Sequence, residues 1–169
     1  QVSPDGNWVI FTSARSGKYT LWKVSIDGGE PVQLTDKYTL APAISPDGKQ
    51  IACFYWDEQP KSQLKIAVLP FEGGEFTKIF EPTFTRFSYP FLLRNTIRWT
   101  PDGQSLTYLQ TLNGVDNIWS LSVADGESKQ LTDFKSDRIF TFDWSHDGQS
   151  RACARGTMTA DVVLISDFK

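Results

Sequence analysis

The chain has 169 residues, of which 40% are hydrophobic and 14% aromatic, and this composition excludes an intrinsically disordered protein. The formal net charge of −3 argues against electrostatic attraction to nucleic acid or to an anionic membrane surface. No apolar run approaches the length of a membrane-spanning helix, so we expect no membrane insertion by this segment.

A phrase of the form Ser-Pro-Asp-Gly occurs four times and indicates a repeat architecture. It occupies residues 3–6, 45–48, 100–103 and 145–148, with Thr100 in place of Ser and His146 in place of Pro. Its aspartates are 42, 55 and 45 residues apart, which is a period typical of repeat proteins. Pro and Gly favour a tight turn here, and Ser and Asp side chains cap such turns. We therefore interpret the aspartates as turn-forming residues.

Short runs rich in β-branched and aromatic residues flank the phrases and predict β-strands. In each of the first three repeats, a third run, a Gly-containing turn and a fourth run follow. In chain order, the predicted strands span residues 8–11, 21–24, 32–35, 43–44, 51–54, 64–68, 76–79, 97–99, 106–109, 118–121, 129–132, 142–144, 151–154 and 162–165. No segment has a sustained helical period, so we expect almost no helix.

Four antiparallel strands per repeat are the unit of a β-propeller blade. The sequence therefore predicts an all-β fold, a β-propeller of four repeats with four-stranded antiparallel blades. We place the repeats at residues 1–36, 37–82, 95–133 and 137–169, with an irregular loop at 83–94. The first repeat has only residues 1–3 for its inner strand, and the last stops after its third strand. We therefore expect the C-terminal part of a ring of about six to eight blades, completed by missing blades or by a second copy.

The repeated residues resemble those of the TolB-like, WD-repeat-like family of propeller repeats. The resemblance covers the whole chain and rests on the phrase, on a Leu-Trp or Ile-Trp strand, on Asp-Gly-Gly and on Gln-Leu-Thr. These last three patterns stand at residues 21–22, 27–29 and 33–35, and again in close variants at 118–119, 125–126 and 130–132. The resemblance implies a β-propeller.

A narrower resemblance concerns residues 97–103, 116–119 and 161–169. They look like the C-terminal end of propellers attached to bacterial multidomain regulators, namely serine/threonine kinases and winged-helix transcription factors of acidobacterial type. This resemblance implies a non-catalytic sensor or interaction module of a signalling protein, with an extracytoplasmic location favoured and a cytoplasmic one open. Two alternatives remain: the gating propeller of a prolyl-oligopeptidase-like serine hydrolase, or a TolB-like periplasmic protein.

The sequence offers no catalytic constellation and no metal or cofactor site. His146 is the only histidine and stands in a turn, so no Ser-His or Cys-His nucleophile is expected. Each phrase supplies one carboxylate, too few for calcium. Cys53 and Cys153 stand at matching repeat positions, so we expect two small core residues rather than a disulfide. Four tryptophans at matching positions are expected to pack between blades: Trp22, Trp99, Trp119 and Trp144.

The segment between the second and third repeats breaks the period and is the candidate binding loop. It interleaves aromatic residues with arginines, as interface anchors do, and leads to an inner strand at the channel mouth. The alternative is a covering loop that packs its own aromatics on the neighbouring blades. Two arginines in an acidic chain argue against nucleic acid. The candidate contacts for a protein, a peptide or a small ligand are Phe84, Arg86, Phe87, Tyr89 and Arg94, with Asp137 and Arg138 from the corresponding loop of the last repeat.

Overall fold

The computed structural model describes residues 1–59, 63–82, 97–145 and 147–157, and these residues form strands and turns without a helix. The strands are β1 (Trp8–Ser13), β2 (Thr20–Ser25), β3 (Val32–Gln33), β4 (Tyr38–Ile44), β5 (Gln50–Trp56), β6 (Lys65–Pro70), β7 (Lys78–Phe80), β8 (Arg98–Trp99), β9 (Ser105–Leu112), β10 (Val115–Ser122), β11 (Ser128–Gln130), β12 (Arg138–Trp144) and β13 (Arg151–Gly156). The predicted strands within these ranges are confirmed, and the inner strands β4 and β12 are longer than predicted. The last predicted strand, residues 162–165, lies outside the described residues.

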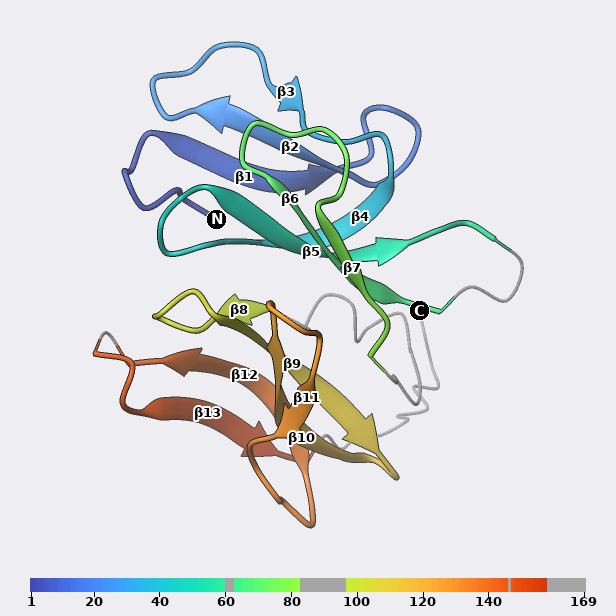
Figure 1. Ribbon diagram of the computed structural model, residues 1–169, viewed down its shortest axis with the longest axis vertical. Coiled ribbons are helices and arrows are strands. Elements are labelled where there is room, and N and C mark those ends of the chain that lie inside the picture. The colour runs from blue at the N-terminus through green and yellow to red at the C-terminus, as the bar shows by residue number, and fades with distance from the viewer. Residues whose placement is uncertain (60–62, 83–96, 146, 158–169) are drawn as a thin grey trace, which may run out of the picture.

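The strands form four antiparallel sheets that follow one another along the chain, as blades do in a propeller (Figure 1). The first sheet has the order β1-β2-β3, with an isolated bridge from Val2 to Val9 in the place of an inner strand. The second and third have the orders β4-β5-β6-β7 and β8-β9-β10-β11. The fourth pairs β12 with β13. The chain is therefore an all-β partial propeller.

The apolar core lies between the blades. Ile51 and Cys53 of β5 contact the first blade, whereas Ala52 and Phe54 contact the third. Successive residues of a strand point to opposite faces, so β5 is apolar without interruption because both faces are covered. Phe142 belongs to a third cluster, between the last two blades.

Each phrase forms the same hydrogen-bonded turn between the inner strand and the next strand. In the second repeat, Ser45 Oγ donates to Asp47 Oδ1 at 2.7 Å, and the amide of Lys49 donates to the same oxygen at 3.1 Å. The amide of Gln50 donates to Ser45 Oγ at 2.9 Å. The third repeat repeats this pattern with Thr100 and Asp102 at 2.6 Å. The prediction that the aspartates cap turns is confirmed.

The four turns also stack on one another along a single edge, on the left of Figure 1, which we call the phrase edge. A methyl group placed on Gly48 would lie 3.7 Å from Pro4 of the preceding phrase, and one on Gly103 would lie 3.7 Å from Pro46. One on Gly148 would lie only 2.8 Å from Pro101. The phrase thus sets the spacing between blades as well as the turn within each blade.

A second turn holds the first two blades together at their outer strands. After β6, Gly73 has φ of +91° and Gly74 donates its amide to Leu34 O of the first blade at 2.8 Å. A methyl group on Gly73 would lie 2.6 Å from the same carbonyl oxygen. Only glycine accepts both this backbone conformation and this approach.

The tryptophan prediction is confirmed at Trp99, which is buried and donates Nε1–H to Ala43 O of the preceding blade at 2.9 Å, and at Trp119, which packs against the same cluster. It is wrong for Trp22, which donates Nε1–H to Thr20 Oγ1 of its own blade at 2.8 Å and belongs to none of the clusters between the described blades. Trp144 reaches Thr107 of the preceding blade at 3.2 Å and is half-buried. The cysteine prediction holds for Cys53 and is wrong for Cys153, which is exposed. Its strand, β13, is the last of the described strands, and Cys153 belongs to none of the apolar clusters between the described blades.

The phrase aspartates make stability depend on pH. A hydroxyl hydrogen bond lowers the pKa of Asp5, Asp47, Asp102 and Asp147 below the ordinary 3.8. Because the folded-state pKa is the lower one, the stabilisation is fully present above 3.8 and is lost as pH falls through the lowered values. We expect the urea concentration at the midpoint of unfolding to decrease as the pH drops below about 4. Asp102→Asn is expected to make this decrease smaller, because it removes one of the titrating carboxylates. Asp27→Asn, in a turn outside the phrases, is the control; an equal reduction by both variants would contradict the assignment.

Gly73→Ala is expected to lower the free energy of unfolding by about 2 to 3 kcal/mol, since it adds a clash to the cost of positive φ. Gly28→Ala is the matched control, because Gly28 has φ of +96° with nothing within 4 Å of an added methyl group. The control is expected to cost about 1 kcal/mol. Urea denaturation at neutral pH measures both values, and equal losses would show that the contact with Leu34 contributes nothing.

Candidate binding surface at the loop end of the blades

The ends of the blades opposite the phrase edge differ from repeat to repeat. Strands β1, β5 and β9 finish at this end, on the right of Figure 1. Residues 14–19 connect β1 to β2, whereas residues 113–114 alone connect β9 to β10. We call this the loop end. Variable loops on a regular scaffold are where binding residues are usually found.

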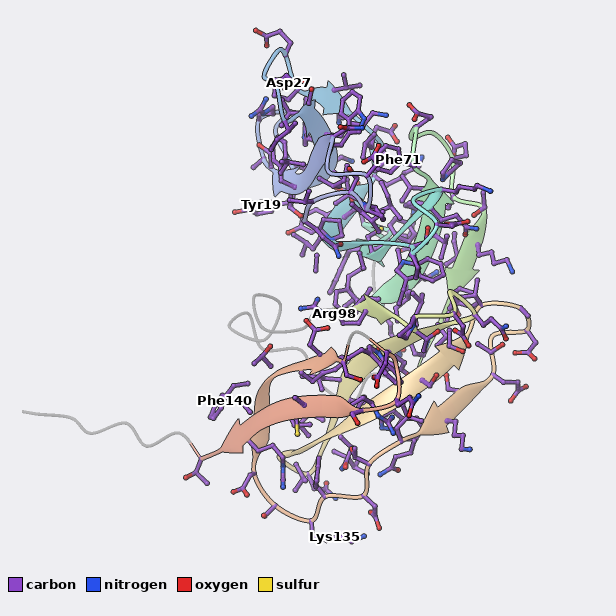
Figure 2. The ribbon with its side chains drawn as sticks, turned by 90° about the vertical axis from the view of Figure 1, so that its left-hand side faces the viewer. Tyr19, Asp27, Phe71, Arg98, Lys135 and Phe140 are labelled. Atoms are coloured by element: carbon purple, nitrogen blue, oxygen red, sulfur yellow. The ribbon has the colours of Figure 1, made fainter. Side chains whose placement is uncertain are left out.

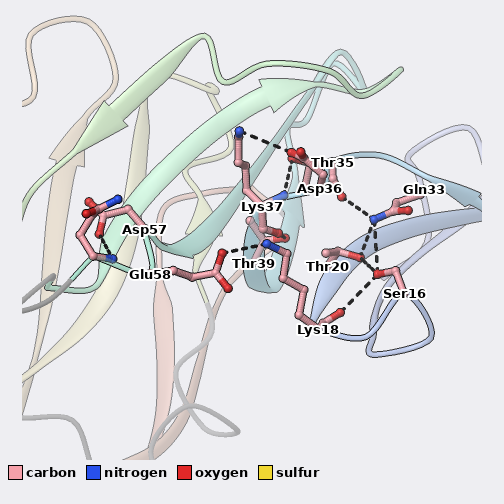
Figure 3. A network of polar contacts seen from close by, with 11 residues as sticks. Ser16, Lys18, Thr20, Gln33, Thr35, Asp36, Lys37, Thr39, Asp57 and Glu58 are labelled. Atoms are coloured by element: carbon pink, nitrogen blue, oxygen red, sulfur yellow. Dashed lines mark hydrogen bonds and ion pairs between the residues drawn. The ribbon is translucent and has the colours of Figure 1, made fainter.

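A polar network joins the first two blades at the loop end (Figure 3). Lys18 Nζ lies 2.8 Å from Glu58 Oε2 across the two blades, and this hydrogen bond raises the pKa of Lys18. Gln33 Nε2 donates to Thr35 O at 3.0 Å. In the third blade, Gln130 Nε2 donates to Thr132 O at 2.6 Å. The repeated Gln-Leu-Thr pattern therefore organises the loop that leads to the next blade.

A second ion-pair group lies at the end of β5. Lys65 Nζ is 2.7 Å from Glu81 Oε1 and 3.0 Å from Asp57 Oδ2. The hydrogen bonds from Glu81 and Asp57 raise the pKa of Lys65 to about 12. This lysine remains charged at physiological pH and links the β5–β6 loop to the segment that follows β7.

Each of the first three blades exposes one large apolar side chain at the loop end. Tyr19 is 40% exposed, Trp56 is 36% exposed and Leu112 is 57% exposed, and they come from three different blades. Tyr19 packs edge-on against Tyr38, with ring centroids 6.0 Å apart. Figure 2 shows Tyr19 projecting from the first blade. Large aromatic side chains held partly in water are the residues that anchor protein partners.

The predicted contacts Asp137 and Arg138 lie at the start of β12 and are tied into the fold. Arg138 Nε is 2.9 Å from Asp116 Oδ2. Asp137 has φ of +69° and its carbonyl accepts the amide of Asp116 at 3.2 Å. Arg155 lies 3.7 Å from Asp137 Oδ2. These two residues stand at the loop end, and both are engaged in structural contacts.

The sequence reasoning missed the centre of this arrangement, Asp116. Its side chain is 2% exposed and accepts from Thr111 Oγ1 at 2.6 Å and from the amide of Ile139 at 2.9 Å, in addition to Arg138. A carboxylate at this depth is stable only with several donors. The signal was an Asp inside a strand, where the first repeat has Tyr19.

The remaining predicted contacts lie outside the described residues, as does His146. These contacts are Phe84, Arg86, Phe87, Tyr89 and Arg94.

In the described ranges, no three His, Cys, Asp or Glu side chains are placed to hold a metal ion. Burial raises the pKa of the Cys53 thiol far above its usual range, so this thiol is not an activated nucleophile. A search of the described residues for a helix long and apolar enough to cross a membrane finds none.

Replacement of Asp116 tests the arrangement around it. Asp116→Ala removes the buried acceptor of three hydrogen bonds and is expected to lower the free energy of unfolding by about 3 kcal/mol. Arg138→Ala removes a partner that is 40% exposed and is expected to cost about 1 kcal/mol or less. Chemical denaturation measures both, and an Asp116→Ala loss no larger than that of Arg138→Ala would contradict the structural role.

The chain is similar to two curated relatives. An uncharacterised protein of Agrobacterium fabrum is 26% identical over 115 residues, which cover 64% of this chain and 38% of that protein. Dipeptidyl-peptidase 5 of Porphyromonas gingivalis is 25% identical over 148 residues, which cover 80% of this chain and 21% of that protein. The chain therefore spans well under half the length of either relative. No protein-family model matches it.

Solved structures agree with the fold. TolB from Acinetobacter baumannii aligns with a TM-score of 0.70 at 21% identity, covering 90% of this chain and 36% of that chain. A protein of Agrobacterium tumefaciens assigned as TolB aligns with a TM-score of 0.64 at 26% identity, covering 88% of this chain and 50% of that chain. With the four phrases and the stacked sheets, these likenesses show that the chain has the fold of a partial β-propeller, similar in structure to the propellers of these two proteins.

Proposed function

We propose that this chain is a non-catalytic binding module whose loop end docks a protein or peptide. The observation that carries the proposal is that each of the first three blades exposes an apolar side chain at that end, namely Tyr19, Trp56 and Leu112. They come from separate blades, whereas the opposite edge consists of repeated turns that stabilise the fold. Rigid blades supply a fixed platform, and a partner that covers these side chains would gain the free energy of their burial.

The loop predicted from the sequence extends the same proposal. It follows Glu81, which the structure places in the ion-pair group with Lys65 at the loop end. Phe84, Arg86, Phe87, Tyr89 and Arg94 are proposed as further contacts of the same partner. By its resemblance to propellers of bacterial regulators, the module would form the sensing part of an extracytoplasmic signalling protein.

Selection of binding peptides tests the loop end directly. Peptides from a random display library are enriched on the immobilised chain, and their affinity is then measured for Tyr19→Ser with Trp56→Ser. We expect these two substitutions to weaken binding about tenfold or more, because aromatic anchors dominate interfaces. The matched control is Val32→Ser with Ile79→Ser, which removes exposed apolar side chains from the outer strands β3 and β7.

The control pair is expected to leave the affinity unchanged. Equal loss in both pairs, or no loss in the loop-end pair, would contradict the proposal. The loop is tested separately by Arg86→Ala with Tyr89→Ala, and unchanged affinity with an intact fold would exclude the loop as a contact.

A second candidate is the propeller of a serine peptidase, in which the hydrolase domain lies elsewhere in the protein. The similarity to dipeptidyl-peptidase 5, over 80% of this chain, favours it. The full gene distinguishes the two candidates. A hydrolase domain with a nucleophile elbow would support the peptidase, whereas a kinase or winged-helix domain would support the binding module.

A further inference from the structure

A pocket of about 480 Å³ lies on the phrase edge between the first two blades, far from the loop end. Its walls are the phrase turns of both blades and the turn after β6. Three carboxylates line it, those of Asp5, Asp47 and Glu72, together with the rings of Trp8 and Phe71. Figure 2 looks onto this edge and labels Phe71 in the turn beside the first blade.

The two rings and Glu72 already hold one ammonium group, that of Lys23. The Lys23 nitrogen lies 4.8 Å from the centroid of the Trp8 ring and 4.8 Å from that of Phe71. It is 2.5 Å from Glu72 Oε2, and the residue is only 5% exposed. Cations at this distance from aromatic faces are attracted by the ring quadrupole. The local chemistry therefore favours alkylammonium groups.

Lys23 is paired with Glu72, so the pocket lining keeps two further carboxylates, those of Asp5 and Asp47, the second of which also interacts with the charge of Lys49. Within the described part of the chain, both hydrogen bonds to the Asp47 side chain use Oδ1, which leaves Oδ2 to a ligand. The carboxylates are not grouped as a metal site. An organic cation with a flexible apolar stem fits such spread charges better than a compact ion does.

Comparison with the other repeats shows that the fold does not require these residues. Gln50, Ser105 and Ser150 stand at the position of Trp8, three residues after the phrase aspartate. By strand register, Val68 and Ser120 stand at the position of Lys23. The second and third blades, which carry these other residues, still form four-stranded antiparallel sheets. Two departures from the repeat pattern, on different strands, thus meet at one pocket.

We propose that this pocket binds an alkylammonium group, either the lysine side chain of a peptide or a free polyamine. The ammonium lies between Asp5 and Asp47, and the methylene stem packs on the accessible parts of the Trp8 and Phe71 rings. Lys23 keeps the rings and Glu72 in place behind the ligand. The site is independent of the loop end, so it stands or falls separately from the proposed partner surface.

The test is a titration of the 169-residue chain with blocked lysine (N-acetyl-lysine methylamide) and, separately, with cadaverine, followed by NMR of the Trp8 indole N–H and the Gly48 amide. Blocked norleucine is the matched ligand control, because it has the same apolar stem without the ammonium. We expect both amines to shift these two signals and norleucine to leave them in place. The tighter of the two amines identifies the source, peptide or polyamine.

Variants of the chain distinguish amine binding in the pocket from nonspecific attraction of amines to a negatively charged protein. Asp47→Asn, which can keep the turn, is expected to weaken amine binding about threefold to fivefold, whereas the matched Asp102→Asn in the third phrase leaves it unchanged. Trp8→Gln, which copies the second repeat, is expected to weaken it to a similar extent. If the Trp8→Gln variant does not fold, the comparison of Asp47→Asn with Asp102→Asn still tests the proposal. Equal weakening by Asp47→Asn and Asp102→Asn, equal shifts with norleucine or with Ca²⁺, or no shift with either amine would overturn the proposal.

Discussion

The contact between neighbouring blades is the constraint on which the rest of this structure depends. A small twisted sheet cannot bury both of its faces by itself, so the apolar side chains of each blade are covered only when another blade lies against them. The alternation along β5 shows this most directly, because Cys53 faces the first blade and Phe54 faces the third. The stacked prolines and glycines of the phrases and the close approach of Gly73 to Leu34 set the spacing at which these side chains meet.

The two ends of the blades consequently have different tasks. The phrase edge repeats one turn in every blade, with its capping hydroxyl, its carboxylate and its positive-φ glycine. A substitution in one of these turns affects two blades, because each turn contacts the turn of its neighbour. The loop end carries unequal loops, ion pairs between blades and the exposed side chains of Tyr19 and Trp56. The alkylammonium pocket is the exception. There, Trp8 and Lys23 add a binding chemistry to an edge whose other turns serve the fold.

Several features of the sequence predicted their structural role because that role is local. The phrase turns and the predicted strands in the described ranges depend on short-range chemistry, and they formed where the pattern indicated. Cys153 was predicted wrongly, since its repeat position implied a covering blade and burial depends on which neighbour lies beside it. Asp116 was missed for a related reason. Its structural role depends on the hydrogen bonds that Thr111, Ile139 and Arg138 donate to its carboxylate, and the fold brings these residues together from two blades.

The sequence by itself determined the repeat, the strand order within each blade and the chemistry of the turns, because each is set by residues close together in the chain. Only the tertiary structure decided which side chains meet between blades. Lys23 lies 49 residues from Glu72, yet the stacking of two blades places their side chains in one ion pair. The same stacking brings the aspartates of the first two phrases, which are 42 residues apart in the sequence, into the lining of one pocket. A local sequence pattern does not predict such contacts, because they depend on how whole blades pack against each other.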